Sequence, residues 1–222
     1  MNLSNLQRVK ICGITHPEQA QAIARCGATT LGFICVPASP RFVSTEQIAE
    51  MTAAVRSIES DIQRSIEFIG VFANADIDTM TATALVGGLT GIQLHGDESP
   101  DDCKTLRTVL PELELIKAFR IRVASDLEAT TFAPYTETID TFLLDAYHPD
   151  QLGGTGQTLD WDALEAFTPS KPWFLAGGLK PANVREALTR LHPTGIDVSS
   201  GVERSPGDKD LQQVEQLFQM LH

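Results

Sequence analysis

The chain has 222 residues, 42% of them hydrophobic and 21% charged, a composition that supports a large core without disulfides or a structural metal. Its formal net charge of −12 argues against nucleic acid or anionic membrane as a partner. Four cysteines without a C-x-x-C pair or a histidine at zinc-ligand spacing indicate reduced thiols in a cytoplasm. We expect no signal peptide and no membrane span, since no apolar run approaches the ~18 residues required.

Short apolar runs alternate with longer amphipathic segments from one end of the chain to the other. The runs are apolar on both faces, as expected of parallel strands that are covered by helices. In chain order the predicted strands are Arg8–Cys12, Thr30–Cys35, Ile66–Phe72, Gly91–Leu94, Leu113–Phe119, Thr141–Leu144, Trp173–Ala176 and Gly195–Val198.

Helix-start patterns lie between these strands. A capping box, with Glu or Gln three residues after Ser or Thr, begins at Thr15, Ser44 and Ser125. Ser99 followed by Pro100 predicts an N-cap and a proline in the first helical position. The stretch after Asp208 carries an apolar stripe of period 3.6 and predicts a closing helix. Thr130 and Thr131 are poor helix formers, so local propensity supports the predicted helix around 125–133 less than the other helices.

The strand–helix alternation predicts one domain over residues 1–222, a single (β/α)₈ barrel with eight parallel strands and few insertions. An open, doubly wound sheet is the main alternative. The first strand–helix turn, Cys12–Thr15, lacks the G-x-G-x-x-G pattern, which makes the dinucleotide-binding version of that alternative improbable.

In such a barrel the active site lies at the C-terminal ends of the strands. The residues predicted at those ends include a thiol, a carboxylate, an arginine and two glycine-containing turns. They are Cys12 after the first strand, Arg41 after the second, His95 after the fourth, Asp145 after the sixth, Gly177 and Gly178 after the seventh, and Ser199–Gly201 after the eighth.

These residues lie in motifs that follow one another in a characteristic order. The motifs are KICGIT (10–15), GF-x-x-x-P-x-S-P-R (32–41), GVFAN (70–74), QLHGDE (93–98), LLDA (143–146), GGTG (153–156), DW (160–161), AGGL (176–179) and DVSSGVE (197–203). Over essentially the full length the set resembles phosphoribosylanthranilate isomerase. One departure is Ala38, where relatives often carry a lysine.

The resemblance implies an Amadori rearrangement, an aldose–ketose isomerisation in tryptophan biosynthesis. The substrate would be N-(5-phosphoribosyl)anthranilate, a small phosphosugar, and the product 1-(2-carboxyphenylamino)-1-deoxyribulose 5-phosphate. A general acid opens the furanose ring, and a general base removes the C2 proton of the resulting iminium ion. No metal ion and no redox cofactor is required, and no feature of the chain indicates an obligate protein partner.

Carried over from the family, Cys12 is the general base and Asp145 the general acid. A thiol that acts as a base near neutral pH should have a pKa below the usual ~8.5, lowered by nearby positive charge. Lys10 lies two residues before Cys12, so both side chains point to the same side of the strand. A buried lysine needs a carboxylate partner, which the sequence does not single out. Asp145 should be partly desolvated, since an acid must hold its proton.

The resemblance also assigns residues that bind the substrate. Arg41 would clamp the anthranilate carboxylate, because a guanidinium binds a carboxylate in a bidentate manner. Asp197 either faces the ligand, at the anthranilate amine, or is the partner that Lys10 needs. His95 either contacts the substrate or is a hydrogen-bonded residue of the wall.

Gly177, Gly178, Ser200 and Gly201 would form the phosphate site, since loops after the seventh and eighth strands of such barrels often bind phosphate through backbone N–H groups. The glycines at 153–156 are interpreted as a mobile lid. The acidic run Asp97, Glu98, Asp101 and Asp102 is expected to be a solvated helix start, favoured by the helix dipole.

Two other functions remain open at this point. Another phosphosugar barrel enzyme would share the phosphate loops, but the cyclase of the same pathway relies on Lys and Glu, and the histidine-pathway isomerase relies on two Asp. The KICG strand end, without an Asp, argues against both. A non-catalytic phosphosugar-binding barrel should have lost the acid or the base, and both are present.

Overall fold

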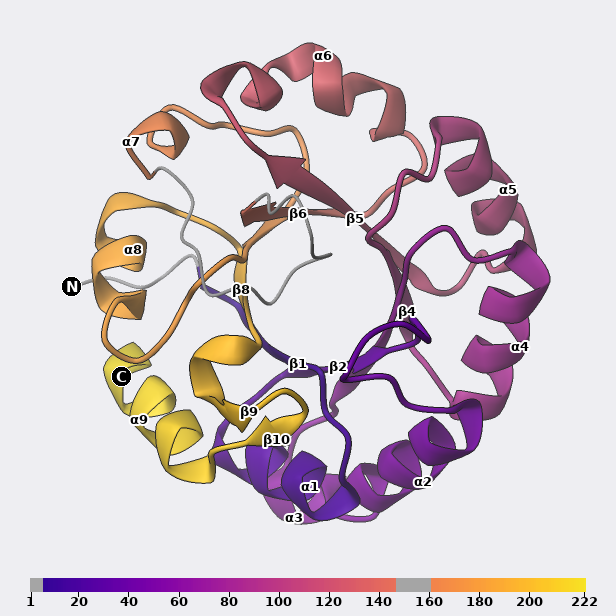
Figure 1. The fold of residues 1–222 in the computed structure, drawn as a ribbon, viewed down its shortest axis with the longest axis vertical. Helices are drawn as coiled ribbons and strands as arrows, with labels where there is room; N and C mark the ends of the chain where they lie inside the picture. Colours follow the sequence, from indigo (N-terminus) through magenta and orange to yellow (C-terminus); the bar gives the residue numbers. More distant parts are fainter. Residues whose placement is uncertain (1–5, 147–160) are drawn as a thin grey trace.

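Eight parallel strands close into a barrel in the order β1-β2-β3-β4-β5-β6-β7-β8, surrounded by a ring of helices (Figure 1). The computed structural model describes residues 6–146 and 161–222. The predicted barrel is therefore confirmed, and the strand ends differ from the predictions by at most two residues. The barrel strands are β1 Arg8–Cys12, β2 Thr30–Ile34, β3 Glu67–Phe72, β4 Gly91–Leu94, β5 Glu114–Ile121, β6 Thr141–Ala146, β7 Trp173–Leu175 and β8 Gly195–Val198.

The helices of the described residues lie on the outside of the barrel and cover the strands. They are α1 Pro17–Cys26, α2 Thr45–Arg56, α3 Glu59–Ile62, α4 Ile77–Gly87, α5 Pro100–Val109, α6 Ala129–Phe132, α7 Trp161–Leu164, α8 Val184–Arg190 and α9 Leu211–Leu221. Three short 3₁₀ helices accompany them, at Ala124–Leu127, Ala133–Tyr135 and Ser200–Val202. The closing helix predicted after Asp208 is α9.

The predicted helix starts are confirmed at two positions. Ser44 and Ser99 cap α2 and α5 with their side-chain oxygens, which accept from the backbone N–H groups of Gln47 and Asp102. The capping box at Thr15 is wrong. His16 precedes α1 without a side-chain cap, and the Thr15 hydroxyl instead donates to the Gly207 carbonyl at 2.6 Å, far along the chain.

The capping box at Ser125 is also wrong, because the segment does not form one regular helix. It is divided into two 3₁₀ turns and the four-residue α6. The carboxylate of Asp126 accepts from the backbone N–H groups of Arg122 and Val123, so Asp126 rather than Ser125 satisfies the backbone at the start of the first 3₁₀ turn.

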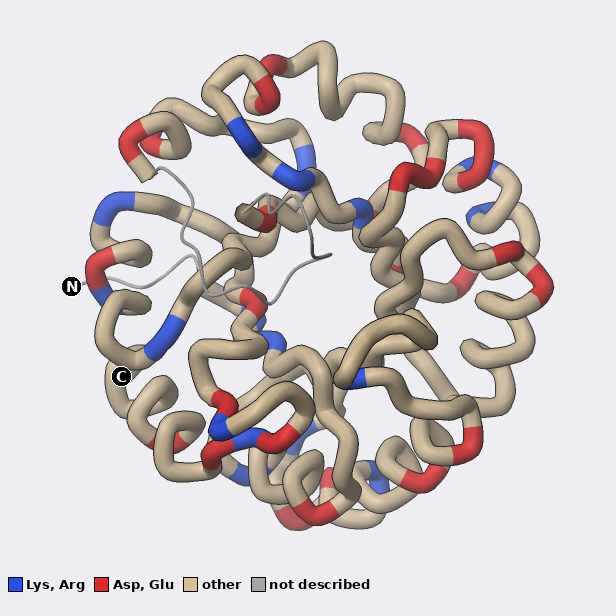
Figure 2. Tube along the Cα trace, viewed as in Figure 1, with Lys and Arg blue, Asp and Glu red and all other residues tan. Residues whose placement is uncertain are grey.

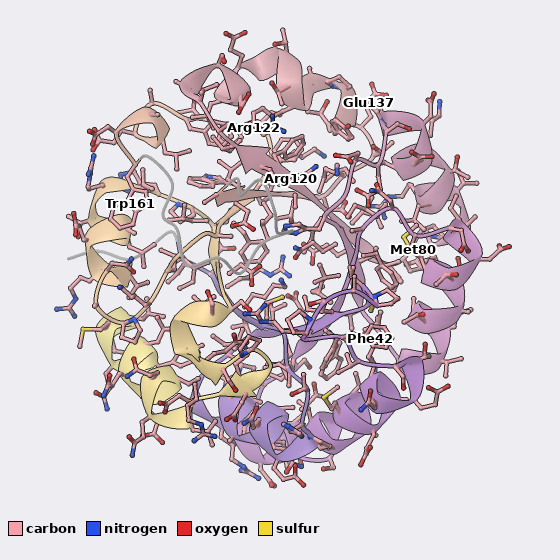
Figure 3. The ribbon with its side chains drawn as sticks, viewed as in Figure 1. Phe42, Met80, Arg120, Arg122, Glu137 and Trp161 are labelled. Atoms are coloured by element: carbon pink, nitrogen blue, oxygen red, sulfur yellow. The ribbon has the colours of Figure 1, made fainter. Side chains whose placement is uncertain are left out.

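Apolar side chains fill both the barrel interior and the layer between strands and helices (Figure 3), where Met80 of α4 is 3% exposed. The interior holds a separate cluster of Ile69, Ile116, Ala118, Leu143, Phe174 and Ala176. At the N-terminal end of the barrel, Arg8 binds the carboxylates of Glu67 and Glu114 and lies 4.8 Å over the Phe174 ring. This end of the barrel is closed by structural contacts, which leaves the opposite end for a ligand.

A two-stranded hairpin after β8 is an addition that the sequence analysis did not predict. It consists of β9 Glu203–Ser205 and β10 Asp208–Lys209, which pair antiparallel. Gly207 lies between them with a φ of 85°, a left-handed conformation that favours glycine. The hairpin folds back beside α1 (Figure 1) and brings Glu203 and Lys209 close to the C-terminal end of β1.

Acidic residues are spread around the outer ring of helices and loops (Figure 2), in keeping with the net charge of −12. None of the helices in the described ranges is long and apolar enough to cross a membrane.

Candidate active site

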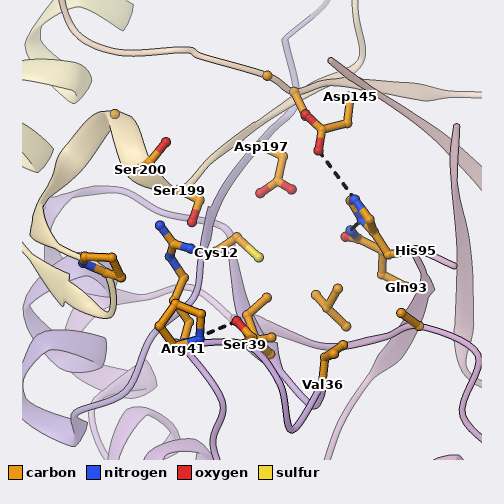
Figure 4. Close-up of a pocket in the computed structure, with 18 of the residues that line it drawn as sticks. Cys12, Val36, Ser39, Arg41, Gln93, His95, Asp145, Asp197, Ser199 and Ser200 are labelled. Atoms are coloured by element: carbon orange, nitrogen blue, oxygen red, sulfur yellow. Dashed lines mark hydrogen bonds and ion pairs between the residues drawn. The ribbon is translucent and has the colours of Figure 1, made fainter. Parts of the chain in front are cut away.

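A cavity of about 460 Å³ opens at the C-terminal ends of the barrel strands. Its size is within the range of small-molecule sites. All nine residues predicted for the site line it: Cys12, Arg41, His95, Asp145, Gly177, Gly178, Asp197, Ser200 and Gly201. The structure thus brings together side chains from five different strand ends, as Figure 4 shows for most of them. The predicted lid at 153–156 lies outside the described residues.

Cys12 ends β1 and is 5% exposed, with its sulfur directed into the cavity (Figure 4). Gly32 on the neighbouring strand leaves room for the thiol, because a Cβ there would lie 2.7 Å from Sγ. Burial raises the pKa of Cys12, with Asp197 adding to the effect and Lys10 and Lys209 opposing it. The expectation of a lowered pKa is therefore wrong for the unliganded protein.

Lys10 has the partner that the sequence left undetermined. Its ammonium is fully buried and donates to Asp197 Oδ2 at 2.9 Å and to Gln93 Oε1 at 2.8 Å. Burial alone would lower the pKa of Lys10, but the negative charge of its partner Asp197 opposes burial, and the pKa of Lys10 is raised. Asp197 also lines the cavity, and its Oδ1 is buried without a hydrogen-bond partner among the described residues. The Lys10 contact thus leaves one Asp197 oxygen unused.

His95 and Asp145 face one another across one side of the cavity (Figure 4). His95 Nε2 lies 3.4 Å from Asp145 Oδ2, and both side chains are less than a tenth exposed. Asp145 Oδ1 accepts from the backbone N–H of Ala146 at 2.9 Å. Gln93 lies 2.8 Å from His95 Nδ1 and is 1% exposed. The sequence analysis missed Gln93, although it lies two residues before His95 and therefore on the same face of β4.

Arg41 is held in place by Glu203 rather than lying on an open loop. Its Nε donates to Glu203 Oε1 at 3.0 Å and its Nη2 to Oε2 at 2.7 Å. Lys209, fully buried, donates to the same carboxylate at 2.6 Å and to the Cys12 carbonyl at 2.5 Å. Burial would raise the pKa of Glu203, but hydrogen bonding from Arg41 and the charge of Lys209 outweigh it and lower that pKa.

The backbone of the two glycine turns requires glycine at several positions. Gly177 and Gly178 have φ values of 82° and 62°, in the left-handed region. A Cβ at Gly201 would lie 1.9 Å from the Leu179 carbonyl oxygen, so the loop after β8 packs against the loop after β7. The two turns form one continuous wall of the cavity, as a shared phosphate site would need.

The acidic run after β4 is only partly solvated, contrary to the expectation. Glu98 is 5% exposed and pairs with the buried Lys117 at 2.8 Å. The other oxygen of Glu98 accepts from the backbone N–H groups of Asn74 and Gly96. This ion pair therefore joins the loops after β3 and β4 and fixes the backbone next to His95.

Within the described ranges, no three His, Cys, Asp or Glu side chains gather as ligands for a metal ion. The polar groups in the cavity are instead a thiol, carboxylates, an imidazole and an arginine, which are groups for proton transfer and anion binding. The closed barrel and this cavity define a (β/α)₈-barrel enzyme of the acid–base type.

Comparison with known proteins identifies the family. The model of the family described as "N-(5'phosphoribosyl)anthranilate (PRA) isomerase" matches residues 9–220, and the chain belongs to this family. The N-(5'-phosphoribosyl)anthranilate isomerase of Nostoc punctiforme is 58% identical over 214 residues, which are 96% of this chain and 98% of the relative. The corresponding protein of Microcystis aeruginosa is 57% identical, covering 96% and 97%.

Solved structures agree with the family and the fold. The phosphoribosyl anthranilate isomerase of Thermotoga maritima has a TM-score of 0.83 at 30% identity, covering 97% of this chain and 98% of that one. A second isomerase structure, in complex with reduced 1-(o-carboxyphenylamino)-1-deoxyribulose 5-phosphate, has a TM-score of 0.78 at 29% identity, covering 96% and 97%.

Proposed function

We propose that this family member isomerises N-(5'-phosphoribosyl)anthranilate to 1-(2-carboxyphenylamino)-1-deoxyribulose 5-phosphate, with Asp145 as general acid and Cys12 as general base. The reaction is the aldose–ketose isomerisation after which the relatives are named, and it belongs to tryptophan biosynthesis. The single observation that carries the residue roles is that Cys12 and Asp145 line one cavity from two different strands, β1 and β6.

Asp145 gives its proton to the ring oxygen of the furanose, and the ring opens to an iminium ion between C1 and the anthranilate nitrogen. The thiolate of Cys12 then removes the C2 proton, which gives an enolamine that tautomerises to the ketose. The positive charge of the iminium ion favours the thiolate, because an opposite charge within a few ångströms favours the ionised form. This assistance offsets the raised pKa of the resting thiol.

Arg41 binds the anthranilate carboxylate. Two of its nitrogens are committed to Glu203, so the guanidinium is held at a fixed angle at the edge of the cavity. Lys209 shares the Glu203 carboxylate and keeps its pKa low, so that Glu203 stays ionised and Arg41 stays in place.

The phosphate of the substrate lies against Gly177, Gly178, Ser200 and Gly201, where backbone N–H groups can approach closely. The free oxygen of Asp197 faces the anthranilate amine, and its other oxygen holds Lys10. His95 contributes to the wall beside Asp145.

The protein works in a reducing cytoplasm, on a small molecule and without nucleic acid, a membrane or an obligate protein partner. Four free cysteines and a net charge of −12 support this assignment.

A fluorescence assay tests the proposal. The preceding enzyme of the pathway makes the fluorescent substrate in situ from anthranilate and phosphoribosyl pyrophosphate, and turnover removes the signal. Cys12→Ser and Asp145→Asn should each lower kcat by about 10²–10⁴-fold, the usual contribution of a positioned acid or base. Cys35→Ser is the matched control, since Cys35 does not line the cavity, and it should keep wild-type turnover. A folded wild type without turnover would contradict the proposed reaction.

A further inference from the structure

A series of polar side chains in contact with one another connects Asp197, proposed to face the anthranilate amine, with Asp145, the proposed acid. It runs from Asp197 on β8 to Lys10 on β1, then to Gln93 on β4, and from there through His95 to Asp145 on β6. Figure 4 shows Gln93 beneath His95, whose ring points toward Asp145. The series therefore has four successive contacts, and the direction of each can be worked out from the chemistry of its groups.

The direction is fixed from the Lys10 end. An ammonium group only donates, so the atom of Gln93 that faces Lys10 must be its carbonyl oxygen, Oε1, at 2.8 Å. The atom that faces His95 Nδ1 at 2.8 Å is then the amide nitrogen, which only donates. Nδ1 must accept this hydrogen bond and therefore carries no proton. The proton of the imidazole is on Nε2.

The protonated Nε2 points at the proposed acid. It lies 3.4 Å from Asp145 Oδ2 and is buried without a hydrogen-bond partner among the described residues. A buried donor without a partner is costly, so such a group is expected to gain one during function. The acceptor at 3.4 Å is the oxygen that would become negative when Asp145 gives up its proton.

We propose that Gln93 is a positioning residue that fixes His95 as a neutral Nε2–H donor aimed at Asp145. The inference rests on the proposed role of Asp145. When Asp145 transfers its proton to the ring oxygen of the substrate, the new carboxylate accepts a hydrogen bond from His95 Nε2–H, and no proton leaves the imidazole. Because the Gln93 amide occupies Nδ1, the Nε2–H of His95 stays directed at Asp145 and is available to the new carboxylate.

The other charged groups near His95 are already paired. Lys10 and Asp197 pair with one another on the far side of Gln93, and Lys117 pairs with Glu98, whose carboxylate also holds the backbone N–H of Gly96. Among the described residues, the side chain at ion-pair distance from the imidazole is that of Asp145. The two ring nitrogens of His95 therefore face Gln93 and Asp145.

Nitrogen NMR of the wild-type protein tests the inference without any turnover. At neutral pH the ¹⁵N resonances of His95, identified by their loss in His95→Asn, should show a protonated Nε2 and an unprotonated Nδ1. A proton on Nδ1, alone or together with one on Nε2, would overturn the inference. A wild type that shows the expected tautomer but no turnover would contradict the proposed function instead.

Two isosteric variants test the consequence. In Gln93→Glu the carboxylate only accepts, so His95 should carry a proton on Nδ1, and kcat should fall at least about tenfold with KM changed less, a part of the ~10²–10⁴ that a positioned acid contributes. Gln93→Met neither donates nor accepts, so both tautomers should appear and kcat should fall less than in Gln93→Glu. Gln216→Glu, on the exposed face of α9, is the matched control and should keep wild-type kcat and the wild-type tautomer.

The outcomes separate positioning from a loss of structure. Equal loss of kcat in both Gln93 variants, with the His95 tautomer unchanged, would contradict the inference. If Gln93→Glu does not fold, as judged by thermal unfolding, Gln93→Met and the wild-type spectrum still decide the question.

Discussion

Each buried cation around Cys12 is held by a carboxylate. Lys10 is paired with Asp197, and both Lys209 and Arg41 are paired with Glu203. The positive charges that the sequence suggested as activators of the thiol are thus largely balanced, and burial decides the direction of the pKa shift of Cys12. We infer that the thiol is protonated until a cationic intermediate arrives.

Removing Lys10 should raise the pKa of Cys12 further. Lys10 is the larger of the two lysine charges that oppose the effect of burial, and its loss leaves Asp197, which disfavours the thiolate, without a partner. In Lys10→Met the pH at which the thiolate forms should therefore move to a higher value than in the wild type. The ultraviolet absorbance of the thiolate, taken as the difference from a matched Cys12→Ala variant, measures this midpoint.

Thermal unfolding is the control, since an unpaired buried carboxylate also costs stability. A folded Lys10→Met protein whose Cys12 thiolate forms at the wild-type pH or below it would show that Lys10 does not act on the thiol. A wild-type midpoint below the usual ~8.5 of a free thiol would contradict the raised pKa itself.

At the scale of elements, one of the two residue pairs between β7 and β8 is tightly packed. Phe174 and Gly195 are direct partners in the parallel register, and a Cβ at Gly195 would lie 2.1 Å from Phe174 Cε1. The φ of Gly195 is not in the left-handed region, so the need for glycine at this position is one of space.

Gly195→Ala should therefore destabilise the barrel by about 1–3 kcal/mol, the usual cost of overpacking a core. Phe174→Leu creates space at the same point. The double variant should therefore lose less free energy of unfolding than the two single variants lose together. Urea unfolding of the four proteins measures the coupling free energy, expected at about 0.5–3 kcal/mol for residues in contact. A coupling free energy of zero would mean that the Phe174 ring is not the reason why position 195 needs glycine.

The elements also show which features a sequence can predict. The strands were predicted to within one or two residues because apolar runs and helix starts are local signals. Ser44 and Ser99 were predicted correctly for the same reason. Thr15 and Ser125 were not, because Thr15 bonds to Gly207 and the segment at 124–135 is a series of tight turns. The β9–β10 hairpin has no strong periodicity over its few residues and was missed.

At the scale of the whole molecule, the barrel topology explains why the cavity lining could be predicted. Once eight parallel strands close, residues at their C-terminal ends meet at one face, whatever their distance in the sequence. The contacts between side chains at that face could not be predicted in the same way. The contacts of Lys10 with Asp197, of Arg41 with Glu203 and of Lys209 with Cys12 span 162 to 197 residues, and no local pattern encodes them. The sign of the Cys12 pKa shift depends on those pairs, so it could not be predicted either.

The proposed roles of Cys12 as base and Asp145 as acid involve the whole molecule, since the two residues come from opposite halves of the chain. A substrate with deuterium at C2 tests it most directly, because only the base breaks that bond. In Cys12→Ser the removal of the C2 proton should become the slowest step, so the primary isotope effect on kcat should exceed that of the wild type. In Asp145→Asn ring opening should be slowest, and the isotope effect should be close to one. A large isotope effect in Asp145→Asn, or none in Cys12→Ser, would contradict the assignment of the base and the acid.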